Sequence, residues 1–444
     1  MYDKILELID KRQFAQLQKE LEDMRSADVA EALDQLDSKN AIIIFRLLSK
    51  DNAAEVFSRL STKQRKDIVN ATHETQLDEI LDELSFDDMI DFLEEMPSNF
   101  VKRVISTSTE EERRLINQFL KYPEDSAGSL MTIEYIDLKK EMTVKQALAH
   151  IKKTGVDKET IYTCYVLNEK RRLEGIVSLR KLVLSDENLL VSEIMDENFI
   201  ATKTLDDQEE IASIFKKYDL LSLPVVDKET RLVGIITIDD IVDVIEQENT
   251  EDFLRMAAME PSGEVYLHSD TWALAKRRMP WLLVLMLSAT LTEGIIGKYE
   301  EVLHTVALLA ASIPMLMDTA GNAGSQSSTL IIRGIALGEI EMADYIKVFV
   351  KELKVSALVG VFLGAVNFLR MLLFTAAGFK IGLTVSLTLV LTVVMAKVIG
   401  GLLPIIAKKV NMDPAIMAGP LITTIVDATS LIVYFNIATM LLNI

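Results

Sequence analysis

The sequence predicts a multidomain chain with an all-α superhelical N-terminal domain, an α+β tandem repeat, a long connecting helix and a five-helix transmembrane domain. Apolar stretches long enough to cross a bilayer occur only after residue 278. The charge changes at the same place: residues 1–270 carry 57 acidic and 34 basic residues, and residues 271–444 carry 10 and 13. An internal repeat lies between these regions. We therefore divide the chain into a soluble acidic half and an apolar membrane half.

Residues 1–128 are expected to be all helical. A Leu or Met followed by a residue that favours helix starts recurs about every 12 residues. The units are Leu36-Asp37-Ser38, Leu48-Ser49-Lys50, Leu60-Ser61-Thr62, Leu84-Ser85-Phe86 and Met96-Pro97-Ser98. This spacing predicts a superhelix of short helices.

The internal repeat pairs RRLEGIVSLRKLVLS (171–185) with TRLVGIITIDDIVDV (230–244). Each copy indicates β-rich runs around a polar turn, followed by a helix. The copies, placed at 129–188 and 189–245, resemble a tandem pair of CBS domains. Many CBS repeats hold an adenosine ribose with an Asp three residues after a Thr or Ser. Thr237 and Asp240 match this pattern, whereas the first copy has Ser178 and Lys181, so ATP binding is possible but weakened.

Residues 246–270 are expected to form a connecting helix that leads to the first membrane span. Acidic side chains are frequent in the segment DDIVDVIEQENTEDFLRMAAME (239–260), on the N-terminal helices and at Asp219. Such residues can simply form a solvated face. Carboxylates that meet at domain interfaces repel one another unless a divalent cation lies between them. A cation sensor that compacts when the ion is plentiful is therefore the alternative we favour.

Five apolar stretches are long enough to span a membrane: 279–296, 302–332, 355–377, 381–407 and 414–442. With five spans, all the basic clusters fall on one side, which predicts that this side is the cytosol. The N-terminus lacks a secretory signal pattern, in agreement with a cytosolic first half. We expect a multi-pass plasma-membrane protein whose C-terminus lies outside.

Charged residues within spans are costly and indicate function. Asp427 lies midway along the fifth span, one turn after Thr423 and Thr424. Asp318 lies in the second span, where it could face a pore or cap a broken helix. The same span contains Pro314, Gly321 and Asn322, which free or supply oxygen ligands. Carboxylates, amides and carbonyls are oxygen ligands that suit Mg²⁺ or Ca²⁺. The glycines alone could also be explained by tight packing of neighbouring helices.

Several function classes are disfavoured. A single cysteine, Cys164, excludes an intrachain disulfide framework and Cys-rich zinc sites. The acidic surface disfavours nucleic acid. The sequence has no Walker-type phosphate loop, and its four histidines lack ligand spacing, so we do not expect an enzyme.

The order of these parts resembles the MgtE family of magnesium channels. The most specific matches are YPEDSAGSLMT (122–132), PMLMDTAGNAGSQSST (314–329) and DPAIMAGPLITTIVDATS (413–430). The resemblance implies a homodimer whose pore is formed by the second and fifth spans, with Asp427 as pore acid and Asp413 at the cytosolic mouth. It also implies that residues 246–262 act as a plug. It implies cytosolic Mg²⁺ sites at Asp91, Glu209, Asp219, Asp240, Asp243, Glu248, Glu251 and Asp252.

Two departures from the family pattern stand out. Lys181 replaces an acid of ATP-binding members, and Ala320 replaces a glycine common in the second-span motif. The expected function is a Mg²⁺-selective uptake channel in the plasma membrane, closed by cytosolic Mg²⁺. The alternatives are a Na⁺-coupled Mg²⁺ exporter and a membrane-tethered nucleotide sensor that regulates a partner.

Overall fold

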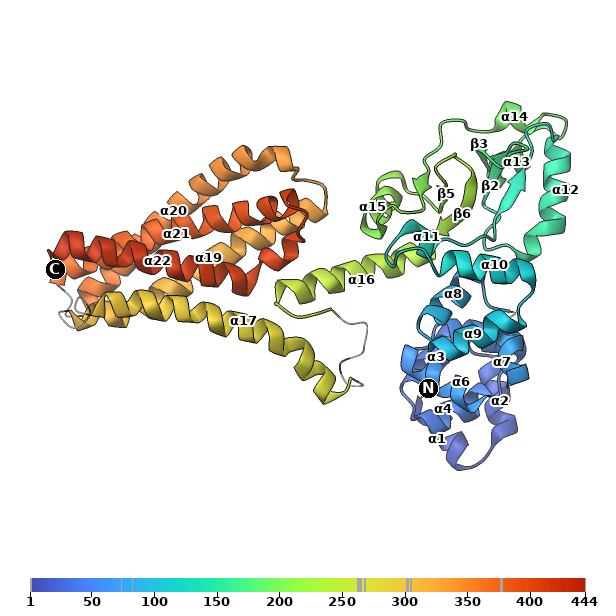
Figure 1. Cartoon of the computed structure of the whole chain (residues 1–444), viewed down its shortest axis with the longest axis horizontal. Helices are drawn as coiled ribbons and strands as arrows, with labels where there is room; N and C mark the ends of the chain where they lie inside the picture. The colour runs from blue at the N-terminus through green and yellow to red at the C-terminus, as the bar shows by residue number, and fades with distance from the viewer. Residues whose placement is uncertain are drawn as a thin grey trace. The chain divides into compact units, whose positions relative to one another are not determined.

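The structure is a computed structural model that describes residues 2–72, 74–81, 83–261, 266, 269–300, 303, 306–375 and 378–443. It divides into two compact units, Met1–Ile245 and Glu246–Ile444 (Figure 1). The division falls inside helix α16 (Ile238–Met256). Each unit is described by itself.

The N-terminal domain consists of short helices, as the spacing of its helix starts predicts. They are α1 (Tyr2–Asp10), α2 (Phe14–Glu22), α3 (Ser26–Asp34), α4 (Ser38–Phe45), α5 (Lys50–Ser58), α6 (Thr62–Ala71), α7 (Glu74–Leu81), α8 (Phe86–Glu94), α9 (Ser98–Thr107) and α10 (Glu110–Phe119). Asp37, Ser49, Ser61, Ser85 and Pro97 each immediately precede one of these helices. The predicted starts are therefore confirmed.

Hydroxyl groups at several of these helix starts connect neighbouring helices, whereas Thr109 caps its own helix α10. Ser26 Oγ donates to Glu55 Oε2 at 2.6 Å, and Thr62 Oγ1 donates to Glu95 Oε1 at 2.9 Å. Ser61 donates through both its backbone N and its Oγ to Asp34. The repeated start residue thus fixes one helix layer against another about 30 residues away, as expected for a superhelix.

Each half of the predicted repeat folds as a three-stranded sheet with helices. The first copy contains β1 (Ile136–Leu138), α12 (Val144–Thr154), η1 (Gly155–Asp157), β2 (Thr163–Leu167), β3 (Leu173–Ser178) and α13 (Leu179–Leu184). The second contains β4 (Thr202–Lys203), α15 (Gln208–Tyr218), β5 (Ser222–Val226), β6 (Leu232–Thr237) and the start of α16. Short helices α11 (Ala127–Leu130) and α14 (Val191–Ile194) precede the two copies. Both sheets pair the first strand parallel and the last strand antiparallel to the middle one.

The two copies are joined through matching backbone contacts. Leu173 N donates to Thr230 O at 3.1 Å, and Leu232 N donates to Arg171 O at 3.0 Å. These reciprocal bonds join the β2–β3 turn to the β5–β6 turn. Tyr165 Oη also lies 2.8 Å from Ser222 Oγ in a buried contact. The repeat therefore forms one paired module.

Helix α16 is shorter than the connecting helix that the sequence predicts through residue 270. It ends at Met256, Ala258 adopts a left-handed φ of 53°, and Pro261 follows. A left-handed residue followed by a proline ends a helix because neither continues its hydrogen bonds. Residues 262–265, 267 and 268 of the predicted helix lie outside the described part of the chain.

The second unit contains the long helices α17 (Thr271–Lys298), α19 (Ala307–Ala336), α20 (Tyr345–Phe374), α21 (Gly378–Lys409) and α22 (Gly419–Leu442). Short helices η2 (Met342–Asp344) and η3 (Pro414–Met417) precede α20 and α22. Among the described residues, four segments are long and apolar enough to cross a membrane: Thr271–Lys298, Met342–Phe374, Gly378–Lys409 and Pro414–Leu442.

Helix α19, which coincides with most of the predicted second span, is not among these four. It runs unbroken from Ala307 through Pro314 to Ala336 and packs against α21 and α22, and Val306, which precedes it within the predicted span, is not helical. Residues 302, 304 and 305 of that span lie outside the described part. Gly324 and Gly400 lie where α19 crosses α21, and a Cβ on Gly400 would collide with Gly324 O. These glycines allow the two backbones to approach closely.

Candidate ion pathway and acidic clusters

The apolar second unit brings two carboxylates from different helices together. Asp427 lies in the middle of α22 and interacts electrostatically with Asp318 of α19. Asp427 Oδ1 is buried and accepts no hydrogen bond from any group that the structure describes. An unpaired carboxylate oxygen beside a second carboxylate, within a membrane-type helix, requires a positive charge nearby.

The predicted neighbours of Asp427 surround this carboxylate. The Thr423 and Thr424 hydroxyls both donate to Pro420 O, at 2.8 and 3.0 Å. Their oxygens retain lone pairs that can accept from a water molecule or contact a cation. A Cβ added to Gly321 would lie 3.0 Å from Thr423 Cγ2 and 3.9 Å from Asp427 Oδ1. Gly321 thus keeps α19 close to this part of α22.

Helix α19 also carries a polar face that is exposed in the single chain, although Gln326 Oε1 on this face accepts from Lys397 Nζ of α21 at 3.4 Å. Asp318, Asn322, Gln326 and Thr329 are exposed in the single chain and follow helical spacing. A face of this kind is not stable against lipid hydrocarbon, because its polar groups would lack partners. It therefore faces water, an ion or another protein surface. Asn322, which the sequence singled out, belongs to this face.

A buried polar cluster beside this face includes a residue that sequence reasoning missed. Glu352 of α20 is only 8% exposed, and Ser327 Oγ donates to its Oε2 at 2.6 Å. Lys397 of α21 is 6% exposed and lies 3.5 Å from Ser327 Oγ. Glu352 stands among lysines in the sequence, so nothing there marked it as buried. The cluster joins α19, α20 and α21 through balanced charges.

Asp413, which lies just before η3 and α22, forms an ion pair that the sequence did not predict. Its Oδ1 accepts from Ala415 N at 2.7 Å, and its Oδ2 pairs with Arg255 of α16. Arg255 also pairs with Glu251. Because Arg255 and Asp413 are 158 residues apart in sequence, no local pattern indicates this contact. The end of α16 is thereby held at the start of α22.

Three further observations describe the same region. Burial, Asp413 and Glu248 together raise the pKa of Asp252 to about 6, while Arg255 opposes this rise. Met256 packs with Ile332, Ala415 and Ala418. Gly419 has a φ of 43°, and a Cβ there would lie 2.8 Å from Met256 O. Acidic residues therefore crowd around one arginine at this position, which we call the α16 latch (Glu248, Glu251, Asp252, Arg255 and Asp413).

In the first unit, acids of the N-terminal domain meet acids of the repeat module. Desolvation, and then the charge of Asp87, raise the pKa of Asp91 to about 7 and that of Asp240 to about 8. Desolvation and the same Asp87 raise the pKa of Glu159 to about 7. Asp87 Oδ1 is itself buried with no hydrogen-bond partner in the described part of the chain. We call Asp87, Asp91, Glu159 and Asp240 the Asp87 cluster.

Asp240, one residue of the predicted ribose-binding pair, belongs to the Asp87 cluster. Thr237 Oγ1 donates to Asp240 Oδ2 at 2.8 Å. In the first copy, Ser178 Oγ instead accepts from the backbone N of Lys181 and caps α13. The two copies therefore differ chemically at equivalent positions, as the sequence indicates.

The remaining predicted acids are not gathered at one site. Glu209 lies in the first turn of α15 and Asp219 is its C-cap, so the rise of the helix separates them by about 15 Å. Asp243 and Glu248 lie on α16. The described residues contain no group of three or more His, Cys, Asp or Glu placed to hold a metal ion directly.

Comparison with known proteins assigns each part of the chain. Residues 24–125 match the family described as the MgtE intracellular N domain, and residues 127–186 and 191–247 each match the CBS domain. Residues 313–437 match the family described as divalent cation transporter. Part of the chain is also similar to inosine-5'-monophosphate dehydrogenase of Aquifex aeolicus, at 33% identity in a match that covers 45% of this chain and 39% of that enzyme.

Two relatives match over nearly the whole length. The magnesium transporter MgtE of Thermus thermophilus is 37% identical and covers 96% of this chain and 95% of its own. The magnesium transporter MgtE of Bacillus subtilis is 30% identical, and the match covers 94% of this chain and 92% of that protein. A crystal structure of the cytosolic domain of the Mg²⁺ channel MgtE in complex with ATP is 36% identical, with a TM-score of 0.53, and covers 55% of this chain and 100% of that one. The chain belongs to the MgtE family of magnesium transporters.

Proposed function

We propose that this chain forms a homodimeric, Mg²⁺-selective channel that carries Mg²⁺ into the cytosol across the plasma membrane. The supporting observation is Asp427, whose buried Oδ1 has no described donor and which lies beside Asp318. A hydrated Mg²⁺ ion, which keeps its water tightly, can be bound by such carboxylates through its hydration shell. An inward-negative potential supplies about 2.3 kcal/mol per charge per 100 mV to drive entry.

The dimer is inferred from the exposed polar face of α19. Asp318 and Asn322 need water or a protein group as a partner, and a second copy of the same face would provide a shared polar surface for both residues. Two Asp427 carboxylates then line one pathway around a two-fold axis. This arrangement requires α19 to cross the membrane as the second of five spans, in addition to the four apolar segments, in the bundle interior where its polar residues are shielded from lipid.

The orientation follows from the basic residues near the span ends. With five spans, Lys276, Arg333 and Lys408 lie on the same side as the acidic first half. That side is the cytosol by the positive-inside rule, and the C-terminus lies outside.

We further propose that cytosolic Mg²⁺ closes the pathway. Bound Mg²⁺ would relieve the mutual repulsion within the Asp87 cluster and hold the N-terminal domain against the repeat module. The remaining proposed sites, at Glu209, Asp219, Asp243 and Glu248, would add to this compaction. The α16 latch would keep the end of α16 at the start of α22 in the closed state, as the plug that the sequence suggests.

Nucleotide binding at the second copy would involve Thr237 and Asp240. A relative's cytosolic domain forms a complex with ATP. In this chain Lys181 replaces the acid of the first copy, and Asp240 faces Asp87 and Glu159. These acids repel a triphosphate, so we infer that ATP would bind there only together with Mg²⁺.

Mg²⁺ flux into liposomes that contain the purified full chain tests the pathway. We expect Asp427→Asn to reduce flux by at least about tenfold, because loss of a desolvated charge contact weakens ion binding. The matched control is Asp344→Asn, which changes an acid that pairs with Lys347 before α20. Equal flux in wild type and Asp427→Asn would overturn the proposal. Dependence on Na⁺ would favour the exporter, and no flux at all would favour the nucleotide sensor.

A further inference from the structure

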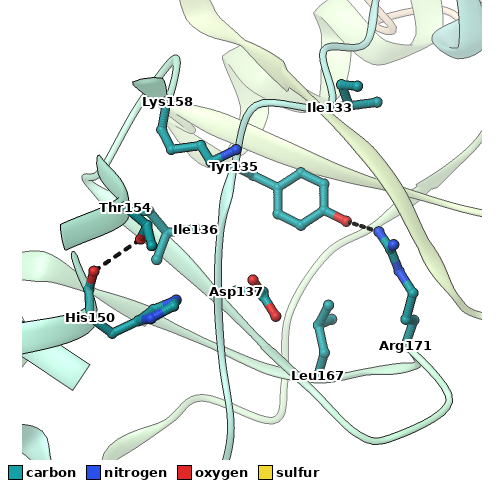
Figure 2. Close-up of a pocket in the computed structure, with 9 residues that line it drawn as sticks. All are labelled: Ile133, Tyr135, Ile136, Asp137, His150, Thr154, Lys158, Leu167 and Arg171. Atoms are coloured by element: carbon teal, nitrogen blue, oxygen red, sulfur yellow. Dashed lines mark hydrogen bonds between the residues drawn. The ribbon is translucent and has the colours of Figure 1, made fainter. Parts of the chain in front are cut away.

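The first CBS copy contains a pocket that is separate from all the acidic sites described above. Its volume is 410 Å³, and it lies along the unpaired edge of β1, between helix α12 and the β2–β3 turn (Figure 2). Lys158 and His150 line one end, and Arg171 lines the other. A pocket of this size accommodates a small organic molecule.

Arg171 is held in place by its backbone and by Tyr135. Its φ of 59° is left-handed, and its carbonyl accepts from Leu232 N in the second copy. Its Nη2 donates to Tyr135 Oη at 2.6 Å (Figure 2). Among the described residues, no carboxylate forms an ion pair with Arg171. Most of its five N–H donors therefore remain available to a ligand in the pocket.

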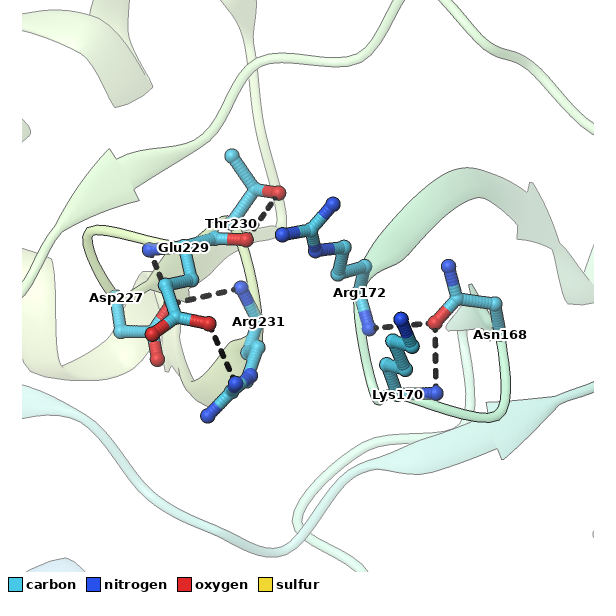
Figure 3. A network of polar contacts seen from close by, with 7 residues as sticks. All are labelled: Asn168, Lys170, Arg172, Asp227, Glu229, Thr230 and Arg231. Carbon is cyan, nitrogen blue, oxygen red and sulfur yellow. Dashed lines mark hydrogen bonds and ion pairs between the residues drawn. The ribbon is translucent and has the colours of Figure 1, made fainter.

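The turn that carries Arg171 is rigid. Asn168 Oδ1 accepts from Lys170 N at 2.9 Å and from Arg172 N at 3.1 Å (Figure 3). The facing turn is built in the same way, because Asp227 Oδ1 accepts from the backbone N of Glu229 and of Arg231. A guanidinium on such a turn is positioned before any ligand arrives, which lowers the entropy cost of binding.

The rest of the lining complements an organic anion. Within the described part of the chain, Lys158 forms no ion pair. Ile133, Ile136 and Leu167 contribute apolar surface, and Asp137 offers an acceptor for a hydroxyl group. Asp137 is 3.9 Å from Lys139 Nζ, so its charge is partly balanced. Residues 1–270 carry 57 acids and 34 bases, and a pocket with Lys158 and Arg171 at its two ends contrasts with that background.

We propose that this pocket binds a small phosphate-bearing metabolite with an apolar and hydroxylated body. Arg171 at one end binds the phosphate, since a guanidinium matches phosphate oxygens, and Lys158 at the other end donates to an acceptor on the body. The isoleucines and Leu167 contact the body, and Asp137 accepts from a hydroxyl. The site shares no residue with Thr237 and Asp240, and it does not depend on the proposed transport mechanism.

The test is equilibrium binding of AMP, ribose 5-phosphate, inorganic phosphate and adenosine to the purified full chain. We expect at least one of the two organic phosphates to bind more tightly than both phosphate and adenosine. Arg171→Gly should weaken that binding by about tenfold or more, because a charge-assisted contact is lost while glycine keeps the left-handed backbone. Lys158→Ala, which leaves the turn and Tyr135 untouched, should weaken it similarly.

Two control variants separate this pocket from other causes. Arg172→Ala removes the same charge from the same turn, but Arg172 does not line the pocket, so binding should persist. Thr237→Ala alters the ribose-binding pattern of the second copy and should also leave binding intact. The inference is overturned if neither organic phosphate binds, or if binding survives both Arg171→Gly and Lys158→Ala. It is equally overturned if Thr237→Ala, and not Lys158→Ala, abolishes binding.

Discussion

Single charged residues decide the chemistry of the second unit. Asp427 is an unpaired acid in the described structure, whereas Asp413 is paired with Arg255. The first is available to a passing cation, and the second is already neutralised by a cation of the chain itself. In the proposed closed state, this single contact holds the end of α16, so its loss would distinguish the open state from the closed one.

The latch leads to a prediction for Arg255→Gln. The change leaves Asp413 and Glu251 without their partner and adds repulsion around Asp252, so we expect the end of α16 to dissociate more readily. Mg²⁺ flux into liposomes should then rise severalfold at high internal Mg²⁺, where the proposed mechanism holds the wild-type pathway closed. Lys354→Gln, which removes an exposed charge from α20, is the control and should leave flux unchanged. Lower or unchanged flux in Arg255→Gln would contradict the latch.

At the scale of elements, the second unit depends on close helix crossings. Helices α19 and α21 meet where a Cβ on Gly400 would collide with the Gly324 backbone. The same pair of helices carries the Ser327–Lys397 contact. A crossing this tight fixes the rotation of α19, and that rotation determines which of its residues face Asp427.

Gly400→Ala should therefore destabilise the membrane unit. Overpacking at a rigid backbone contact costs about 1–3 kcal/mol, since neither helix can move without disturbing the other. Thermal unfolding of the detergent-solubilised chain measures the effect. Gly294→Ala is a matched control, because a Cβ on Gly294 of α17 meets nothing within 4 Å. Equal melting temperatures for the two variants would show that the crossing is not a tight contact.

At the scale of the whole molecule, acids that repel one another meet where the N-terminal domain contacts the repeat module. The pKa values of Asp91, Glu159 and Asp240 lie above those of ordinary carboxyl groups. A raised pKa in the docked state means that docking is favoured when these groups are protonated. That stabilisation is complete below the ordinary carboxyl pKa of about 4 and is lost as the pH rises through about 7 to 8.

We therefore expect docking of the N-terminal domain to loosen between about pH 6 and about pH 9 when Mg²⁺ is absent. Added Mg²⁺ should restore it at the higher pH, because the ion replaces the protons. Hydrogen exchange of α8 in the full chain reports this change. Asp87→Asn removes the central charge, and it should reduce the dependence of docking on pH and its dependence on Mg²⁺. Identical exchange at the two pH values without Mg²⁺ would refute this mechanism.

The sequence by itself determined the parts of the chain and the most distinctive acid. Helix starts, the offset of the repeat and the apolar stretches are local patterns, so periodicity is sufficient to find them. Asp427 was identifiable because a charge within an apolar span is costly wherever that span packs. The end of the connecting helix was placed too late, because acidic periodicity does not reveal where a left-handed residue stops it.

Only the tertiary structure decided which charges meet. Arg255 pairs with Asp413 across 158 residues, and Ser327 binds the buried Glu352 across 25. The charge of Asp87 acts on both Asp91 and Asp240, which lie far apart in the sequence. Burial and electrostatic coupling depend on distances in the folded chain, and those distances are set by helix packing rather than by sequence neighbours. The same packing forms the pocket at the edge of β1, whose residues come from separate elements of one domain.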